Sequence, residues 1–493
     1  MNTLLAILVS ACLVLFPAGA LAGQDEQQKL DHWMEKTMED YGIPGMALVV
    51  TREDRIVYAR AAGSGEPGRS FSVNTQVPLG ELSQTLTALA AARLMEDGLL
   101  DPDDPVRSHI GHFRTGNLAH SEALTLGDLL EHRSGLDPRD YRNELLPDRS
   151  ISAGVVDLRR MMPREEPGGS FRMFHPNYNV VGLLVETVRD EPYGDALRHL
   201  VLEPLGMRST GGERSRLVSG HGSVFGWPRQ RDTSFVRYDL PSTGMVSTAS
   251  DLGRFLLYLH SGVQAGRPSL QDEDSVPEAA VLLSDREVLW EPVTGRQDDL
   301  GLGWYVREDP DGRLRVWRYG NTDNHHVQMV FYPEEQLGVA LVANVNHVVH
   351  RTLVYPRLSG QVVTLLEDGE PPGRPWTGYA HRGLLFLGIG LAIRQIYRMR
   401  RLPAYVAEFR YIGKGPLYLS MLRDLLVPAV LLVVLPRLVR FAFQLQLTYG
   451  DFFREAPDVV LLLAVVSGLA VLNVLLKLIL LLHRPRNPYR VGR

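Results

Sequence analysis

One stretch decides the fold of this chain: VPLGELSQTLTALAAARLMEDGLL, which runs from Val77 to Leu100. Apolar residues recur in it at spacings of three and four, the period that places side chains on one face of a helix. Gly80 precedes the pattern and Gly98 follows its last turn, where a tight entry and a left-handed exit favour glycine. The pattern therefore predicts a helix with one buried face. That face consists of Leu82, Leu86, Leu89, Ala90 and Leu94.

The length and composition allow one large globular domain and an additional membrane region. The chain has 493 residues, of which 45% are hydrophobic. A domain of about 300 residues buries roughly three quarters of its unfolded surface, so it needs neither a metal nor a disulfide for stability. The formal net charge of −5 is the sum over a soluble part and a basic tail, so it describes neither part well. It does not suggest a nucleic-acid partner.

The N-terminus predicts a secretory signal peptide over residues 1–22. An apolar run there is followed by Ala20-Leu21-Ala22, which has the A-x-A form of a cleavage site, so we expect cleavage before Gly23. An uncleaved membrane anchor is the alternative, because no Lys or Arg precedes the apolar run. The only cysteine, Cys12, lies in this segment. The mature chain would then have no cysteine, which fits an oxidising compartment without disulfides.

A family resemblance extends over nearly the whole globular part. After the predicted helix come LDPDDPV at 100–106, LLEHRSGL at 129–136, LEPLGMRST at 202–210, STGMVSTASDL at 242–252 and LGLGW at 300–304. In this order the segments resemble the serine β-lactamase and penicillin-binding-protein superfamily, in its class C and esterase-like branch. The resemblance implies an α+β fold, with an antiparallel sheet flanked by helices and an all-helical subdomain. It also implies a cleft that binds β-lactams, D-Ala-D-Ala peptides or small esters in relatives.

The first catalytic motif of that family is replaced. Relatives carry Gly-Ser-x-Ser-Lys-Thr at the start of this helix, whereas residues 80–85 read GELSQT. A Ser-x-x-Lys pair works because residues i and i+3 share a helix face, so the amine can take the proton of the attacking hydroxyl. Glu81 occupies the Ser position and Gln84 the Lys position. Neither side chain can do the work of the residue it replaces.

The second motif, Tyr-x-Asn, is also replaced. Counting without gaps from Pro167-Gly168 to Gly182 puts Met173 at the Tyr position and His175 at the Asn position. Two inserted residues would match His175-Pro176-Asn177 to the motif instead, and we adopt the ungapped alignment. Methionine cannot relay a proton and usually fills apolar space. His175 can titrate near neutrality, although a lone histidine is more often a hydrogen-bonded structural group.

The third motif, Lys-Thr-Gly or His-x-Gly in relatives, corresponds to Arg318-Tyr319-Gly320. Gly320 is retained and Arg318 keeps a positive charge. The glycine of relatives near Asn324 is missing, and a bulkier loop there would narrow the cleft. The strands Val327–Tyr332 and Leu337–Asn344 are predicted to follow, and Gly45–Thr51 with Arg55–Ala61 to open the same sheet after a helix over Leu30–Tyr41.

Histidines elsewhere raise two further possibilities. His132 and Ser134 belong to a segment that is structural in relatives, and two residues this close seldom form a catalytic pair, so we expect a structural role. His325 and His326 are neighbours on an extended segment and point to opposite sides, which disfavours a shared metal ion. A site of Glu81, His175 and one of these histidines is the metal alternative. We predict no metal and no cofactor.

A Pro- and Gly-rich linker at 367–376 separates the globular domain, residues 23–366, from a membrane region at 377–493. Its apolar stretches Ala380–Tyr397, Leu417–Leu435 and Val459–Leu482 predict about three transmembrane helices, although only the last clearly has the roughly 20 apolar residues required. Basic residues gather between the first and second stretches and after the third, which places these segments in the cytoplasm and the globular domain outside. Arg437 and Arg440 count against this orientation.

These replacements predict a membrane-anchored, multi-pass, extracytoplasmic pseudoenzyme that binds a small ligand or a cell-envelope protein at the degenerate cleft. The cleft would contain Glu81, Gln84, Met173, His175, Arg318 and Gly320. The helix dipole would stabilise the Glu81 carboxylate, which we expect to pair with Arg318. One alternative is a hydrolase in which Glu81 and His175 act as acid and base on a water molecule. Another is a membrane-complex subunit whose spans carry the function.

Overall fold

The computed structural model divides into two compact units, each described by itself below. The first contains residues 1–222, 230–346 and 354–374, and the second contains 223–229, 347–353 and 375–493. The residues that the structure describes are 18–66, 68–141, 150–232, 239–260, 302–309, 312–369, 380–405, 415–442 and 456–482. Most of the predicted signal peptide, residues 1–17, and most of the linker lie outside them.

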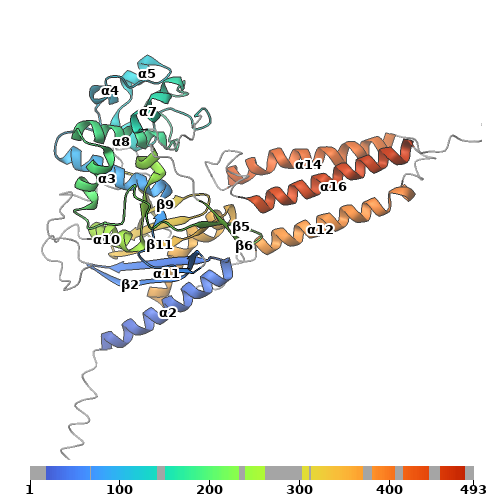
Figure 1. Ribbon diagram of the computed structural model, residues 1–493, viewed down its shortest axis with the longest axis horizontal. Helices are drawn as coiled ribbons and strands as arrows, with labels where there is room; N and C mark the ends of the chain where they lie inside the picture. The colour runs from blue at the N-terminus through green and yellow to red at the C-terminus, as the bar shows by residue number, and fades with distance from the viewer. Residues whose placement is uncertain are drawn as a thin grey trace, which may run out of the picture. The chain divides into compact units, whose positions relative to one another are not determined.

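The first unit is built on a seven-stranded antiparallel sheet with the order β3-β2-β1-β11-β10-β9-β8 (Figure 1). Strand β1 pairs with the central strand β11, with Met46 opposite Ala343, so the N-terminal and C-terminal parts of the domain form one sheet. The four predicted strands are confirmed, with small differences at their ends. The strands are β1 (Gly45–Arg52), β2 (Arg55–Glu66), β3 (Arg69–Ser70), β8 (Tyr305–Glu308), β9 (Leu314–Asn321), β10 (His326–Tyr332) and β11 (Leu337–Ala343).

Helices cover both faces of this sheet, which explains why β1, β10 and β11 are buried along almost their whole length. On one face, α2 (Ala18–Tyr41) and α11 (Tyr355–Asp368) form an apolar cluster with side chains of β1 and β11. On the other face, α10 (Ala249–His260) packs against β1 and β11. The predicted helix at 30–41 is therefore confirmed within a longer one, and α11 extends two residues into the predicted linker.

The stretch Val77–Leu100 forms the short strand β4 (Val77–Pro78), the 3-10 turn η1 (Gly80–Leu82) and the helix α3 (Ser83–Glu96). All five residues of the predicted apolar face are buried. The expectation of a single buried face is nevertheless wrong, because Ser83, Gln84 and Thr87 are equally buried. Thr87 donates a 2.6 Å hydrogen bond to the carbonyl of Pro241, which satisfies its hydroxyl away from water. The helix is thus surrounded on nearly all sides.

An all-helical subdomain lies beyond α3 in the first unit (Figure 1). Its longest helix, α8, packs against α3 and so positions the start of α8 beside the first turns of α3. Its elements are α4 (Val106–His109), α5 (Leu118–Ala123), α6 (Leu126–Leu130), α7 (Ile151–Val156), η2 (Asp157–Arg160), α8 (Pro176–Arg189), α9 (Tyr193–Leu197) and η3 (Arg198–Leu202). The remaining short elements are β5 (Gly220–Val224), β6 (Trp227–Arg231), η5 (Leu240–Gly244), β7 (Val246–Ser247), β12 (Val345–Asn346) and η7 (His350–Val354).

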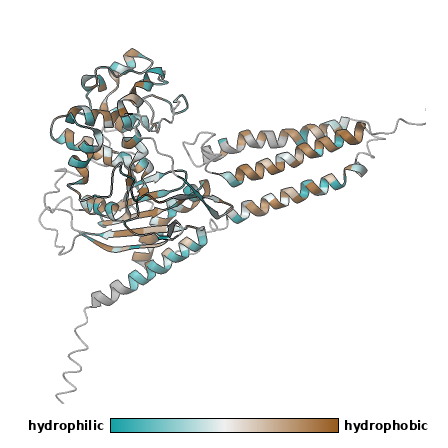
Figure 2. Cartoon of the chain, in the orientation of Figure 1, coloured by the Kyte–Doolittle hydropathy of each residue, from teal (hydrophilic) through white to brown (hydrophobic). Residues whose placement is uncertain are grey.

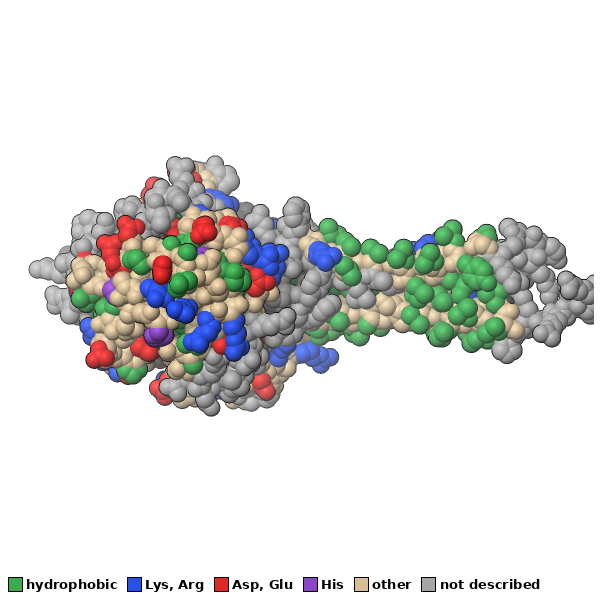
Figure 3. All heavy atoms as spheres, turned by 90° about the horizontal axis from the view of Figure 1, so that it is seen from above, with side chains coloured by type: hydrophobic (Ala, Val, Ile, Leu, Met, Phe, Trp, Pro, Cys, Tyr) green, Lys and Arg blue, Asp and Glu red, His purple; other side chains and the backbone are tan. Residues whose placement is uncertain are grey.

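The second unit is dominated by three helices, α12 (Ala380–Arg400), α14 (Gly415–Ala442) and α16 (Pro457–Leu482), of which α16 packs against the other two. Among the described residues, α16 alone is long and apolar enough to cross a membrane by length and composition. Only 22% of its most apolar window is buried, so most of that surface faces outward. Hydrophobic residues occur along the length of all three helices (Figure 2). Hydrophobic side chains cover much of the helical surface visible in Figure 3. The structure therefore supports membrane anchoring through at least this helix.

Candidate functional site

The candidate site forms where four parts of the first unit meet. These parts are the turn η1 with the start of α3, the end of β9, the segment 131–134 and the start of α8. The predicted cleft residues come from three of them. Glu81 lies in η1 and Gln84 at the start of α3, Met173 and His175 precede α8, and Arg318 and Gly320 lie on β9.

Two glycines allow β9 to approach η1 closely. A Cβ atom on Gly320 would lie 1.7 Å from the carbonyl oxygen of Leu79, well inside any real contact distance. Gly80 has a φ of +53°, and a Cβ there would lie 2.6 Å from the main-chain nitrogen of Asn321. Glycine is therefore required at both positions, by space at the first and by space and conformation at the second. This approach brings Arg318 against the start of α3.

Gln84 is the centre of the polar network in this site. Its side chain is fully buried, and its Oε1 atom accepts hydrogen bonds from Nη2 of Arg318 and, at 3.1 Å, from Nε2 of His132. Its Nε2 atom donates at 3.2 Å to Nδ1 of His175. The residue predicted at the position of the family's lysine is therefore a neutral amide. Its oxygen accepts from two donors, and its nitrogen donates to a histidine.

His132 is neutral in this network. Its Nδ1 atom accepts from the main-chain nitrogen of Phe174 at 3.3 Å and from Nδ2 of Asn177 at 3.4 Å, so the ring proton resides on Nε2. Complete burial, together with the nearby charge of Arg318, lowers the pKa of His132 well below its ordinary value. A proton on Nδ1 would face two donors. His132 consequently acts as a fixed donor to Gln84.

Arg318 is the buried cation of the site, with only 1% of its surface exposed. Its guanidinium lies over the ring of Tyr305, 5.2 Å from the centroid, and its Nε atom donates to the carbonyl oxygen of Glu81 at 3.4 Å. No group among the described residues accepts a hydrogen bond from its Nη1 atom. A guanidinium is ionised at any physiological pH, so the site contains a permanent positive charge.

Glu81 reaches a different partner from the one that the sequence predicts. We expected its carboxylate to pair with the guanidinium of Arg318. In the structure, Oε2 of Glu81 accepts a 2.7 Å hydrogen bond from the main-chain nitrogen of Asn321. The hydrogen bond between Glu81 and Arg318 uses the Glu81 carbonyl oxygen. The carboxylate therefore fastens the end of β9 to η1.

The remaining sequence candidates are more peripheral. Met173 is half-buried and lies two residues before His175 in the chain. Ser134 is buried and accepts a hydrogen bond from the nitrogen of Leu136, which suits the structural role expected for its segment. Ser83, one residue before Gln84, is also buried and accepts from the nitrogen of Met245.

The two adjacent histidines point in opposite directions, as expected for neighbours on an extended segment. His325 is buried beside Asn324, and burial lowers its pKa to about 3. His326 stacks on Tyr355 of α11 with 3.8 Å between ring centroids, so it faces that side of the sheet. Within the described ranges, no three His, Cys, Asp or Glu side chains are grouped so that they could hold a metal ion.

Sequence reasoning missed two members of the network. His132 was expected to be structural, yet it lies within hydrogen-bond distance of Gln84. Its φ of +54° is unusual for a residue with a side chain, and no local pattern indicates it. Asn177, which appears only in the gapped alignment of the second motif, contacts His132. That alignment was the signal that could have found it.

Comparison with known proteins identifies the family. A sequence model described as Beta-lactamase matches residues 30–361, which is more than half of the chain. The chain therefore belongs to the β-lactamase family, as the colinear motifs and the sheet with its helical subdomain indicate.

Individual relatives are distant. Protein flp of Staphylococcus aureus strain COL is 24% identical over 343 residues, which cover 65% of this chain and 64% of that protein. Esterase EstB of Burkholderia gladioli is 30% identical over 198 residues, covering 37% of this chain and 50% of the esterase. The chain thus spans less than two thirds of the length of these curated relatives.

Two solved structures share the fold. The octameric penicillin-binding protein homologue from Pyrococcus abyssi has a TM-score of 0.57 at 21% identity, over 72% of this chain and 81% of that one. EstCE1, a hydrolase with promiscuous acyltransferase activity, has a TM-score of 0.55 at 21% identity, over 71% and 99% of the two chains.

Proposed function

We propose that this chain is a membrane-anchored, extracytoplasmic pseudoenzyme of the β-lactamase family, which binds a small ligand or a cell-envelope protein at its degenerate cleft. The observation that carries the proposal is the bonding of Gln84. Its Oε1 atom accepts from Arg318 and His132 at the position where relatives have the lysine that activates the nucleophile. An amide cannot take a proton from a hydroxyl at neutral pH, and the oxygen of this amide already accepts two hydrogen bonds.

The rest of the cleft supports the same conclusion. Glu81 stands at the nucleophile position, and its carboxylate is bound to the backbone of β9. Met173 offers no group that transfers protons. Removal of the nucleophile or its base from a triad hydrolase reduces the rate by about six orders of magnitude. Replacement of both, with methionine at the Tyr position of the ungapped alignment, leaves no route to an ordinary acyl-enzyme.

Covalent labelling tests this proposal. The full chain in detergent is incubated with a fluorescent penicillin and with a fluorophosphonate probe, and EstB of Burkholderia gladioli serves as the active control. We expect no adduct on this chain. An adduct that peptide mass spectrometry maps to a cleft residue, for example Ser83, would contradict the proposal. A Ser83→Ala variant then shows whether that hydroxyl carries the label.

The alternative function is hydrolysis with altered chemistry, in which Glu81 and His175 act on a water molecule. Glu81 supplies a carboxylate of the kind that a general base requires, and its Oε2 atom accepts a hydrogen bond from the main-chain nitrogen of Asn321. Turnover of small esters by the full chain, abolished in Glu81→Gln and retained in Met173→Leu, would support this alternative. Equal turnover in Glu81→Gln and the unaltered chain would exclude it.

We also propose that α12, α14 and α16 all cross the membrane. The proposal is supported by the outward-facing apolar side chains on each helix, such as Phe386 (69% exposed), Leu419 (68%) and Leu482 (81%). The basic residues between the first two helices and after the third support a cytoplasmic location for those segments, and an extracytoplasmic location for the β-lactamase-like domain.

A further inference from the structure

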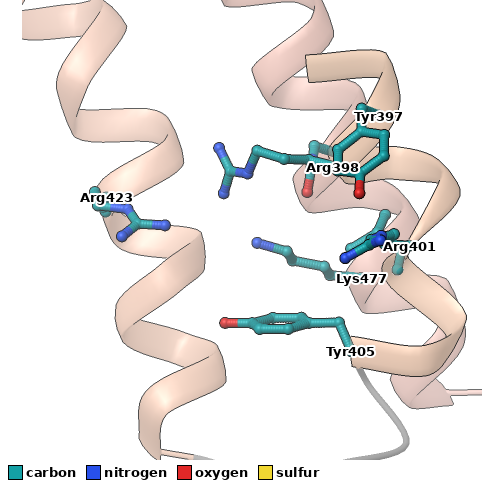
Figure 4. A pocket seen from close by; sticks show the side chains of 8 residues that line it. Tyr397, Arg398, Arg401, Tyr405, Arg423 and Lys477 are labelled. Carbon is teal, nitrogen blue, oxygen red and sulfur yellow. The ribbon is translucent and has the colours of Figure 1, made fainter. Parts of the chain in front are cut away.

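The second unit contains a cavity of about 240 Å³ at one end of its helices, and none of its lining residues belongs to the candidate cleft. It is formed by the end of α12 and the residues after it, by α14 and by α16. Its lining consists of Tyr397, Arg398, Arg401, Leu402, Tyr405, Arg423, Asn473 and Lys477. Figure 4 shows the side chains of Arg398, Lys477 and Tyr405 extending into one space, which Arg423 approaches from the opposite helix.

The cavity has an excess of positive charge. Four of its lining residues are cations, whereas the only carboxylate in hydrogen-bond contact with them among the described residues is Asp424. Asp424 accepts from Arg398 at 2.7 Å and from Lys477 at 2.7 Å, so two cations share one counterion. Within the described residues no carboxylate pairs with Arg401 or Arg423. A buried or membrane-adjacent site with this surplus attracts an anion.

A second, independent observation also points to a ligand. Asn473 on α16 lines the same cavity and is fully buried. Neither its Nδ2 nor its Oδ1 atom has a hydrogen-bond partner among the described residues. A buried amide whose donor and acceptor both lack partners is destabilising, and a bound molecule that pairs with them offsets this cost. The amide group can donate to an oxyanion and accept from a protonated oxygen or a hydroxyl.

We propose that this cavity binds the phosphate group of an anionic phospholipid. Guanidinium groups match phosphate oxygens in paired hydrogen bonds, and the Lys477 ammonium adds a point charge. The volume is below the range typical of drug-sized ligands, so it suits a headgroup. Apolar side chains on the outer surface of the helices, including Leu419 and Leu422 on α14, offer a path for acyl chains. Basic pockets between membrane helices bind anionic headgroups in this manner.

Native mass spectrometry of the full chain in detergent tests the proposal. The probes are dioleoyl phosphatidylglycerol, dioleoyl phosphatidylcholine as the zwitterionic control, and glycerol 3-phosphate as a soluble phosphate ester. We expect retention of phosphatidylglycerol over phosphatidylcholine. The double variant Arg401→Gln/Arg423→Gln should lose about 100-fold in affinity, since each guanidinium loses a hydrogen bond to the charged phosphate that contributes about tenfold. Both residues are exposed, so this variant should fold.

Arg400→Gln is the matched control, because Arg400 belongs to the same basic cluster and does not line the cavity. Its phosphatidylglycerol affinity should change less than threefold. Asn473→Leu, which removes the amide at similar volume, should weaken binding and leave thermal stability equal or higher. Equal binding of the two lipids, or an equal loss in Arg400→Gln and the double variant, would overturn the proposal. If glycerol 3-phosphate binds and phosphatidylglycerol does not, the cavity is a phosphate site, and the proposal that its ligand is a phospholipid is wrong.

Discussion

At the scale of single residues, the neutral side chain of Gln84 accepts a hydrogen bond from Arg318 and so stabilises this buried cation. The sequence predicts that Gln84 occupies the position of the lysine in the family's catalytic Ser-x-x-Lys pair. Its amide orients Arg318, His132 and His175 at once. The buried donors of Arg318 and His132 would otherwise lack this acceptor. A lysine at this position would place its ammonium group beside the guanidinium of Arg318.

Restoring the family's lysine should destabilise the first unit. We expect Gln84→Lys to lower the free energy of unfolding by about 3–5 kcal/mol, because it buries a charge without a counterion. Gln84→Met, similar in volume, should cost about 1–3 kcal/mol, the penalty for leaving donors unpaired. Thermal and denaturant unfolding of both variants in detergent measures the order. A Gln84→Lys variant as stable as the unaltered chain would show that the network relaxes around the charge.

We expect His260 to make the stability of the first unit dependent on pH. It is buried in α10, where its Nε2 atom lies 2.7 Å from the hydroxyl of Thr51, and burial lowers its pKa from about 6.5 to about 4. Below pH 6.5 the unfolded chain binds a proton that the folded chain does not, so stability falls as the pH decreases towards 4. This residue alone should account for about 2 kcal/mol of lost stability at pH 5.

The variant His260→Gln isolates this contribution, because glutamine keeps a hydrogen-bonding group near Thr51 and does not titrate. Between pH 7 and pH 5, its loss of unfolding free energy should be smaller than that of the unaltered chain by about 2 kcal/mol. Parallel pH profiles for the two proteins would refute this assignment.

At the scale of elements, the contact between β9 and η1 forms the site. The close approach of the strand depends on Gly320, where even a methyl group would overlap the carbonyl of Leu79. Gly320→Ala should lower the free energy of unfolding by about 3 kcal/mol or more, since backbone must move to relieve the overlap. It should also displace Arg318 from Gln84.

Gly360→Ala provides the matched comparison. Gly360 lies inside α11, and a Cβ atom there would meet nothing within 4 Å. The substitution should raise stability by about 0.5–1 kcal/mol, because alanine favours the helix. Differential scanning fluorimetry of the two variants is sufficient. A similar change in stability in both variants would mean that the close contact between β9 and η1 does not depend on Gly320.

At the scale of the whole molecule, the β-lactamase-like domain and the helical region are separate compact units. The proposed topology gives an accessibility prediction, which is simple to test because Cys12 is the only native cysteine. In a Cys12→Ala background, Asp451→Cys should react with a membrane-impermeant maleimide in spheroplasts. Lys414→Cys should react only after the membrane is permeabilised. The reverse pattern would invert the orientation, and equal labelling of both would exclude three spans.

The sequence by itself determined the family and the order of the elements, and it predicts which catalytic positions are replaced. These follow from colinear motifs and from local periodicity, which report which residue stands where along the chain. It also identified α16 by length and composition.

Only the tertiary structure decided what the replacements do. Arg318 and Gln84 are 234 residues apart, and His132 and Gln84 are 48 apart, so no local pattern links them. The burial of α3 on nearly all sides and the unpartnered amide of Asn473 likewise depend on neighbours from other elements. Periodicity predicts which face of a helix is apolar, whereas hydrogen bonding between distant segments depends on how closely the folded backbones approach.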